Sequence, residues 1–269
     1  MTDEAEHWAG LGVDELRERW SREAVHLYGS VDSTNERAGE LAESDAPAGT
    51  VVLAREQTRG RGRAGRTWHS PPDTGVYMSV IFRPDRIDNP VLLQLVAGLG
   101  IAAELDADFE GLDPAVKWPN DLIADDRKFG GVLSEATWEE DTPRHLIVGT
   151  GINVETPEEA FPEELRGGAT SMQEVLGEEV PLIDVADAVL RGLEKRLVDP
   201  PKSLDEPSLD LLDRYDWLRD RRVDVQPDDE DEFLDGVCVG VAPDGALLFR
   251  PDRGALRRLH SATVRVPEW

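Results

Sequence analysis

Hydrophobic and polar positions alternate, or β-branched residues cluster, along several segments of the chain. A period of two is typical of half-buried strands, and it predicts strands at 24–31, 50–56 and 75–84, within 115–138, and at 144–155. Helical spacing of hydrophobic residues predicts helices at 13–20, 32–44, 89–107, 182–199 and 208–220. Because strands and helices do not alternate strictly, the pattern favours an α+β fold over a doubly wound parallel sheet.

Local signals support two of the helix starts. Ser33 or Thr34 is a candidate N-cap for the helix at 32–44, because a hydroxyl oxygen can accept from a free backbone N–H there. Pro90 falls in the first turn of the helix at 89–107, where its missing N–H costs no hydrogen bond.

The pattern changes at Arg222. From there short alternating strands are separated by the turn sequences PDDED, PDG and PDRG, which is typical of a small all-β module of the barrel type. We therefore predict three parts: a short acidic helix or tail at 1–23, a large mixed domain at 24–220, and a β domain at 221–269.

Composition narrows the class of protein. A chain of 269 residues can bury a full core, and no apolar run approaches the roughly 18–20 residues of a bilayer span. The acidic start shows no secretory signal, and the single Cys238 excludes an intramolecular disulfide and a cysteine-rich zinc site. We expect a cytoplasmic enzyme or binding protein without a membrane partner.

The charge is strongly negative, with 56 Asp and Glu against 29 Lys and Arg and a formal net charge of -27. Only four of the basic residues are lysines, at positions 117, 128, 195 and 202. This balance is typical of a halophile that keeps its proteins soluble in concentrated salt. The alternative is an acidic surface for a basic partner. In either case a diffuse acidic surface disfavours long-range attraction to DNA.

Positive charge nevertheless gathers on one glycine-rich segment, REQTRGRGRAGRTW at 55–68. Its GRGRAG matches G-x-G-x-x-G, but a dinucleotide fingerprint needs a helix directly afterwards, and here RTWHSPPDTG follows. Glycines let backbone N–H groups approach an anion, and arginines supply bidentate donors for phosphate or carboxylate. The segment therefore matches an anionic ligand. A solvated basic loop or a nucleic-acid contact is the alternative.

Two later stretches add polar chemistry. KWPNDLIADDRKFGG places Lys117, Asn120, Asp121 and Lys128 in one strand–turn–hairpin unit, and lysines are too scarce here to serve solubility. Structural salt bridges could still explain both lysines. GTGINV then brings close-approaching backbone and Asn153 to the end of a strand, although a tight bend explains that stretch equally well.

Taken together and in this order, these stretches resemble the biotin–protein ligase family. The resemblance rests on DSTN (32–35), EQTRGRGRAGRTW (56–68), VKWPNDL with DRKFGGVLSE (116–135), VGTGINV (148–154) and ATSM (169–172). It covers nearly the whole chain from residue 24, and the pairing of GRGRxGR with KWPND is highly specific.

The resemblance implies a fold and a reaction. The fold is a class II aminoacyl-tRNA synthetase-like mixed sheet with flanking helices, followed by a small SH3-like barrel. The reaction condenses biotin with ATP to biotinyl-5′-AMP and transfers biotin to one lysine of a biotin carboxyl carrier domain. Biotin, ATP and Mg²⁺ are the implied small molecules. Because two anions must meet, charge neutralisation is the main catalytic problem.

The resemblance also implies the site residues. It assigns catalysis to Arg63, Lys117, Asp121 and Lys128. It assigns biotin binding to Ser33, Thr34, Asn35, Gln57, Gly60, Arg61, Gly62, Arg63, Lys128 and Gly131. It assigns nucleotide and adenylate binding to Arg63, Arg66, Trp68, Asn120, Lys128, Gly149, Gly151 and Asn153.

Individual roles follow from the same resemblance. Ser33, Thr34 and Gln57 would hydrogen-bond the ureido head of biotin, and Arg63 would hold the adenylate and limit its leakage. Lys128 would lie at the carboxylate and the bridging phosphate oxygen. Asp121 would orient the acceptor amine or Mg²⁺, which arrives with ATP because no His/Cys cluster indicates a protein-bound metal.

Departures from the family pattern limit what the resemblance implies for this chain. Only about 23 residues precede the first strand, too few for the winged helix-turn-helix of relatives that repress transcription, so DNA binding is not expected. Ala64 replaces a common loop arginine, and Ala169 stands where some relatives carry a Trp that stacks on adenine. The chain could act as a monomer or a homodimer.

Three rival functions remain open. A lipoate–protein ligase shares the fold but usually shows an RRxSGGG-type loop, which this sequence lacks. A non-catalytic biotin sensor could dispense with Lys128, which is present here. An RNA-binding module would need aromatic residues beside the arginines, and only Trp68 is near.

Overall fold

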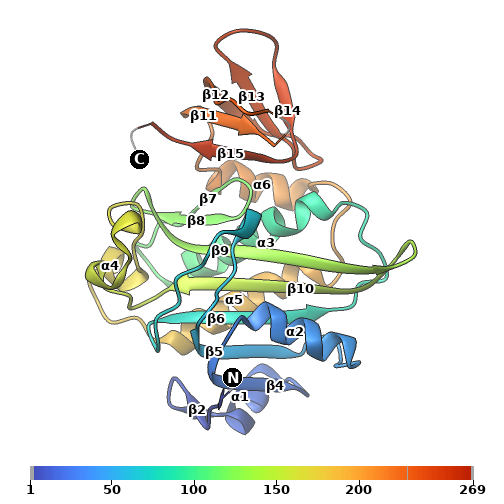
Figure 1. The fold of residues 1–269 in the computed structure, drawn as a ribbon, viewed down its shortest axis with the longest axis vertical. Helices are drawn as coiled ribbons and strands as arrows, with labels where there is room; N and C mark the ends of the chain where they lie inside the picture. Colours follow the sequence, from blue (N-terminus) through green and yellow to red (C-terminus); the bar gives the residue numbers. More distant parts are fainter. Residues whose placement is uncertain (1–2, 229, 268–269) are drawn as a thin grey trace.

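An eight-stranded mixed sheet forms the body of the protein in the computed structural model (Figure 1). The structure describes residues 3–228 and 230–267, so residues 1–2 of the predicted N-terminal segment and residues 229 and 268–269 of the predicted β domain lie outside it. The strand order is β1 (Asp3–Glu4), β4 (Val25–Val31), β5 (Val51–Gln57), β6 (Gly75–Phe82), β10 (Thr142–Asn153), β9 (Arg127–Glu139), β8 (Asp121–Ala124) and β7 (Ala115–Lys117). Strands β4 and β5 pair parallel, and the other neighbours pair antiparallel.

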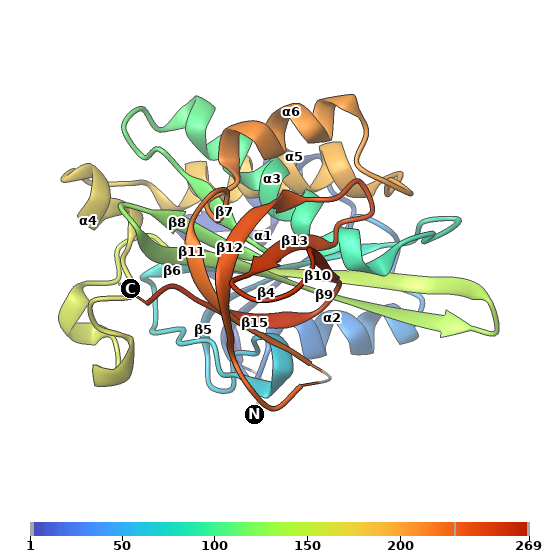
Figure 2. The same cartoon turned by 90° about the horizontal axis from the view of Figure 1, so that it is seen from above.

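Helices cover both faces of this sheet unequally (Figure 2). Helices α3 (Pro90–Asp108), α5 (Leu182–Leu197) and α6 (Glu206–Tyr215) lie on one face, and α2 (Thr34–Glu43) lies on the other. Because strand side chains alternate, Val51 and Leu53 join the large core under α3 and α5, whereas Val52 packs with Ala38 of α2. The α2 side is only partly covered by a helix.

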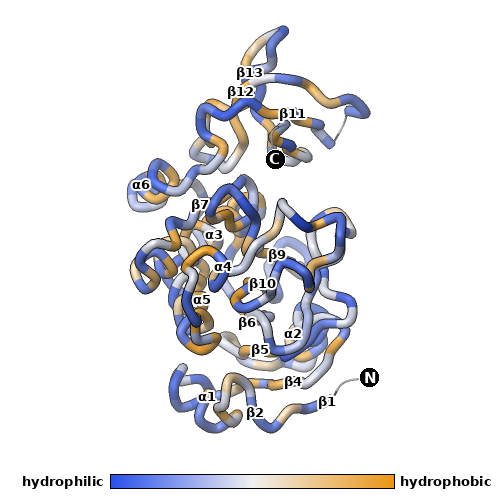
Figure 3. The backbone as a smooth tube through the Cα atoms, turned by 90° about the vertical axis from the view of Figure 1, so that its left-hand side faces the viewer, coloured by the Kyte–Doolittle hydropathy of each residue, from blue (hydrophilic) through white to orange (hydrophobic). Residues whose placement is uncertain are grey.

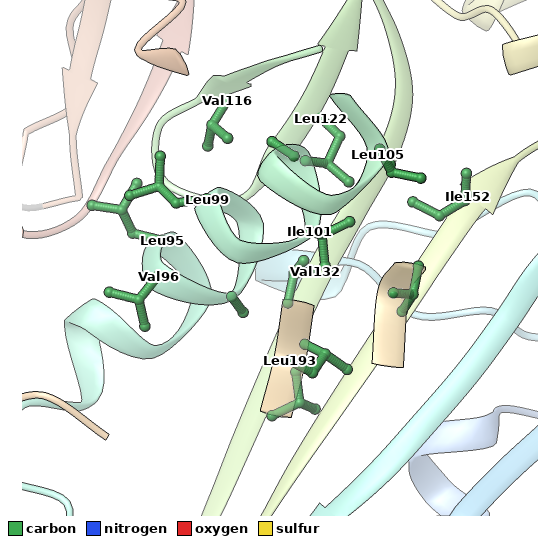
Figure 4. Close-up of a cluster of buried hydrophobic side chains, with 14 of the residues drawn as sticks. Leu95, Val96, Leu99, Ile101, Leu105, Val116, Leu122, Val132, Ile152 and Leu193 are labelled. Carbon is green, nitrogen blue, oxygen red and sulfur yellow. The ribbon is translucent and has the colours of Figure 1, made fainter. Parts of the chain in front are cut away.

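Helix α3 runs through the large core (Figure 4). Asn89 caps it by accepting from Val91 N–H at 3.2 Å, and Pro90 begins its first turn. Close packing against α5 depends on two glycines, since a Cβ on Gly100 would come within 2.4 Å of the carbonyl oxygen of Gly192. In length and composition α3 meets the requirements of a membrane span, contrary to the prediction from apolar runs, but 61% of that stretch is buried inside the protein.

A five-stranded antiparallel sheet follows, in the order β14-β13-β12-β11-β15. Its strands are β11 (Arg222–Pro227), β12 (Leu234–Val241), β13 (Leu247–Pro251), β14 (Arg257–Leu259) and β15 (Ala262–Arg265). It lies at the opposite end of the molecule from α1 (Val13–Trp20), as Figures 1 and 3 show. The connection is anchored where Trp217 N–H donates to the carbonyl of Val116 in β7 at 3.1 Å.

The predicted α+β fold class is confirmed, with differences in detail. The predicted N-terminal helix is α1. Strands β1, β2 (His7–Trp8) and β3 (Leu11–Gly12) precede it, and β1 joins the main sheet. Helix α6 ends at Tyr215 rather than at residue 220, because Asp216 and the following residues turn toward β7. Ser33 holds the N-cap position of α2 without a capping side-chain bond.

Candidate active site

One cavity of about 400 Å³ lies on the α2 side of the main sheet. Its walls come from the start of α2, the arginine loop at 58–67, the hairpin of β8 and β9, the end of β10, and the C-terminal sheet. The structure thereby brings together side chains that are far apart in sequence. The predicted site residues that line it are Ser33, Thr34, Asn35, Gln57, Arg61, Gly62, Arg63, Arg66, Trp68, Lys117, Asn120, Asp121, Lys128, Gly131, Gly149, Gly151 and Asn153.

Gly60 is the predicted site residue that does not line the cavity. It lies against the backbone at the base of the loop, where an added Cβ would come within 2.5 Å of the Trp68 carbonyl oxygen. Its place in the sequence motif therefore reflects close packing of the loop's two arms.

One end of the cavity is a buried network of uncharged polar groups. Thr34 N–H donates to Gln57 Oε1 at 2.9 Å, and Gln57 Nε2 donates to Ser70 Oγ at 2.9 Å. Ser79 Oγ lies 2.8 Å from Thr34 Oγ1 and 2.7 Å from Asn35 Oδ1. Such mutual bonds fix each amide and hydroxyl in one orientation, so this end presents a defined set of donors and acceptors.

Two glycines on β10 make room for this network and for the loop. A Cβ on Gly149 would lie 1.9 Å from Asn35 Oδ1, and a Cβ on Gly151 would lie 2.4 Å from Trp68 Nε1. Neither neighbour could stay in place beside an alanine. The GTGIN stretch is therefore explained by close approach of Asn35 and Trp68 to the strand, which runs on through both glycines to Asn153.

The arginine loop folds as a short hairpin over the cavity. Gly62 N–H donates to the Arg66 carbonyl at 2.7 Å, Trp68 N–H donates to the Gly60 carbonyl at 2.8 Å, and a single turn at 63–65 forms the tip. Arg61 turns toward the sheet, where Arg61 Nη2 lies 2.8 Å from Glu135 Oε1. The same Glu135 carboxylate accepts from Asn35 Nδ2 at 2.8 Å, so it ties the loop to the polar network.

Cations and one carboxylate gather at the other end. The turn between β8 and β9 uses Asp125 and Asp126, both with positive φ, and the resulting hairpin sets Lys128 beside Asp121. Lys128 Nζ donates to Asp121 Oδ1 at 2.5 Å and lies 5.2 Å from the centre of the Trp68 ring. The structure thus makes Asp121 the direct partner of Lys128.

Lys117 is more deeply buried than Lys128, with 6% of its surface exposed. Burial lowers the pKa of Lys117 to about 8, and the neighbouring cations Lys128 and Arg66 act in the same direction while Asp121 opposes them. An anion that enters the cavity would stabilise the charged form of this buried lysine.

Three cavity-lining residues have a buried side-chain polar atom without a hydrogen-bond partner among the described residues. The atoms are Trp68 Nε1, Thr150 Oγ1 and Asn153 Oδ1, the last on a residue that is 3% exposed. Buried polar groups are normally satisfied, so an unsatisfied donor and acceptor on a cavity wall indicate a place for a polar ligand. Asn153 is held in place by its other end, since its Nδ2 donates to the Thr170 carbonyl at 3.1 Å.

Sequence reasoning missed about half of the residues that line the cavity, and it also missed residues that bond to the cavity wall. Ser70 and Ser79 complete the polar network, Glu135 binds Arg61, and Ser261 and Asp228 come from the C-terminal sheet. Glu135 stands at the end of the quoted DRKFGGVLSE stretch, so its alternation with Gly131 and Leu133 on β9 could have indicated it. Nothing near Ser261 or Asp228 in the sequence signals a site.

Within residues 3–228 and 230–267, His, Cys, Asp and Glu side chains form no cluster of three or more that could hold a metal ion. The cationic end of the cavity is instead suited to neutralising anions, and the uncharged end to binding a neutral polar group. A ligand with a carboxylate and a phosphate brought to Lys128, Lys117 and the loop arginines would have its negative charge offset there.

Comparison with known proteins defines the class first. Residues 28–153 match the biotin/lipoate A/B protein ligase family. Over 241 residues the chain is 33% identical to the bifunctional ligase/repressor BirA of Bacillus subtilis. The aligned region covers 88% of this chain and 72% of that protein. The chain belongs to the biotin protein ligase family, as its sequence predicts.

Two further relatives agree with this membership. The chain is 35% identical over 171 residues to the biotin–[acetyl-CoA-carboxylase] ligase of Mycobacterium tuberculosis, covering 60% of this chain and 58% of that protein. The structure of biotin protein ligase from Aquifex aeolicus in complex with biotin and ATP is 29% identical, with a TM-score of 0.72, over 91% of this chain and 99% of that one.

Proposed function

We propose that this protein is an ATP-dependent biotin protein ligase that forms biotinyl-5′-AMP and then biotinylates one lysine of a biotin carboxyl carrier domain. The observation that carries the proposal is one cavity that has both an uncharged polar end and a cationic end. The uncharged end matches the neutral ureido head of biotin. The cationic end matches the biotin carboxylate and the ATP phosphate that it must meet. The similar Aquifex aeolicus ligase, described in complex with biotin and ATP, supports the choice of substrates.

In the first half-reaction a biotin carboxylate oxygen attacks the α-phosphorus of ATP, and pyrophosphate leaves. Ser33, Thr34 and Gln57 bind the ureido head, so the acid group extends toward Lys128. Lys128 and the loop arginine Arg63 offset the charge that two approaching anions bring together. Mg²⁺ enters with the nucleotide as part of the substrate, and Asp121 is a carboxylate beside Lys128 at this end of the cavity.

In the second half-reaction an acceptor lysine amine attacks the acyl carbon, and AMP leaves. Nitrogen loses a proton and AMP keeps the electron pair of the broken C–O bond. Asp121 orients the incoming amine, and Lys128 continues to stabilise the leaving phosphate. Arg66, Trp68, Asn120, Gly149, Gly151 and Asn153 surround the nucleotide, with Trp68 Nε1 and Asn153 Oδ1 as its free donor and acceptor.

We also propose the wider setting of the enzyme. The acidic composition supports a cytoplasm rich in salt and gives no support for a DNA partner. The change from the mixed sheet to the five-stranded sheet supports a domain boundary near residue 221, after a catalytic domain at 24–220. The protein acts as a monomer or a homodimer.

The test is label transfer to a purified carrier domain in molar KCl with ATP and Mg²⁺. We expect labelled biotin to be transferred, labelled lipoate not to be, and transfer to stop when ATP is omitted. Transfer of lipoate in preference to biotin would assign the chain to the other branch of its wider family. No transfer of either, by folded protein, would refute the proposal.

Lys128→Ala provides the internal control for the first half-reaction. We expect it to fold with an unchanged melting temperature and to lose pyrophosphate release at least a hundredfold, because one offsetting charge at the reacting oxygens is gone. Near-normal pyrophosphate release would remove Lys128 from the proposed mechanism. Lys202→Ala, at an exposed lysine outside the cavity, is the matched control and should keep full activity.

A further inference from the structure

The small C-terminal sheet closes one side of the cavity against the arginine loop. Ser261 and Thr263 line the cavity at the start of β15, together with Asp228, which follows β11. Arg63 Nη2 donates to Ser261 Oγ at 3.4 Å, and Arg66 Nη2 donates to Thr263 Oγ1 at 3.5 Å. The loop therefore rests on hydroxyls that lie 198 and 197 residues further along the chain.

A carboxylate stands behind the first of these hydroxyls. The Ser261 hydroxyl donates to Asp228 Oδ2, so its oxygen lone pairs remain to accept from Arg63. A hydroxyl that donates to a carboxylate is also a stronger acceptor, because the two bonds polarise each other. The Asp228 carboxylate thus strengthens the bond from Arg63 to the serine hydroxyl without contacting the guanidinium itself in this bond.

Electrostatics favours the same arrangement. Burial lowers the pKa of Arg63, while the carboxylates of Asp228 and Asp121 act in the opposite direction and favour its cation. These two acids come from opposite walls, one beside the C-terminal sheet and one on β8. Arg63 is therefore attracted by both acids, and its guanidinium also donates a hydrogen bond to Ser261.

We propose that Ser261 and Asp228 are positioning residues that hold Arg63 over the cavity, so that the C-terminal sheet sets how long the acyl-adenylate is retained. The proposal rests on the proposed function. A guanidinium has five N–H donors, so the bond to Ser261 leaves the others for an adenylate phosphate. An arginine fixed beforehand loses less side-chain entropy when the ligand arrives, which favours retention over release.

Release of labelled biotinyl-AMP from the preformed complex measures this directly. With ATP removed, we expect Ser261→Ala and Asp228→Asn to release the adenylate about threefold to tenfold faster than the unaltered chain. Arg63→Ala should release it faster still. In an Arg63→Ala background the Ser261→Ala change should add nothing, because the proposal has Ser261 act on the adenylate through Arg63. Ser261→Thr, which keeps the hydroxyl, should restore slow release.

Asp252→Asn is the matched control, because it removes an exposed ion pair with Arg222 in the same sheet, away from the loop. Unchanged release in both Ser261→Ala and Asp228→Asn would overturn the proposal. So would faster release of equal size with and without Arg63, which would indicate a general loosening of the sheet. If the unaltered chain forms no adenylate, the proposed function itself fails, and that outcome is separate.

Discussion

Two lysines that stand eleven positions apart in the sequence have different environments in the cavity. Lys128 is paired with Asp121 and keeps part of its surface in solvent, with 30% of its side chain exposed. Lys117 is buried at the start of the same hairpin unit, beneath Trp217, whose ring centre lies 5.8 Å from its Nζ. Desolvation, together with the neighbouring cations Lys128 and Arg66, outweighs the attraction of Asp121 and lowers the pKa of the Lys117 ammonium.

We therefore expect adenylate formation to lose efficiency as the pH rises through about 8, the pKa of Lys117. Below that pH the cation is present, and above it the neutral amine offsets no phosphate charge. The profile of kcat/KM for ATP, followed by pyrophosphate release without acceptor, reports the free enzyme. Lys117→Arg should keep its charge to pH 9.5, so the fall of kcat/KM above pH 8 should become shallower. The same fall above pH 8 in the unaltered chain and in the Lys117→Arg variant would contradict the assignment of this pH dependence to Lys117.

At the scale of elements, the end of α6 joins the two sheets. The helix stops at Tyr215, Asp216 forms a bridge to Val116 of β7, and Trp217 Nε1 donates to Asp126 Oδ1 at 2.8 Å in the hairpin turn that precedes Lys128. The segment after α6 thus contacts β7, which carries Lys117, and the turn just before Lys128, and it then leads into β11. The geometry of the catalytic hairpin depends on this junction as well as on its own turn.

Asp216 should destabilise this junction at neutral pH. Its side chain is 2% exposed, and Oδ2 accepts no hydrogen bond among the described residues, with Arg219 Nε 3.8 Å away. Burial raises the pKa of Asp216 to about 6 against the opposing effects of the Leu218 N–H and Arg219. A carboxyl with a raised pKa binds its proton more tightly when folded, so its contribution to stability falls as the pH rises through 6. Asp216→Asn should raise the free energy of unfolding by about 1–2 kcal/mol at pH 8.

Urea unfolding at pH 5 and pH 8 measures that difference. At pH 5 the gain should shrink, since the native Asp216 is already largely protonated there. Asp210→Asn, on the exposed side of the same helix, should change stability little at either pH. A gain of equal size at both pH values would show that packing, and not charge, is responsible.

For the whole molecule, surplus negative charge sets the balance of surface forces. Numerous Arg–carboxylate pairs lie on the surface, but 56 acidic residues against 29 basic ones are too many for each carboxylate to have a cation of its own. Salt weakens attractive surface pairs and repulsive ones alike. Because repulsion is in excess, screening should favour the folded state overall.

We accordingly expect the melting temperature to rise by about 10 °C between 0.05 M and 2 M KCl, the order of shift that a few kcal/mol produces in a chain of this size. Differential scanning calorimetry measures it. Sucrose at matched osmolality is the control for exclusion effects that do not depend on charge. A melting temperature that falls with KCl would show that attractive ion pairs dominate instead.

The amino-acid sequence by itself determined the longer elements, the α+β class and the family, because alternation, turn residues and the GRGRAGR and KWPND stretches act locally. All but one of the site residues named from the sequence line the cavity, the exception being Gly60. Only the tertiary structure placed Glu135 against Arg61 and Ser261 against Arg63. Those contacts join residues 74 and 198 positions apart, and strand register and sheet packing, which no local pattern specifies, bring them together.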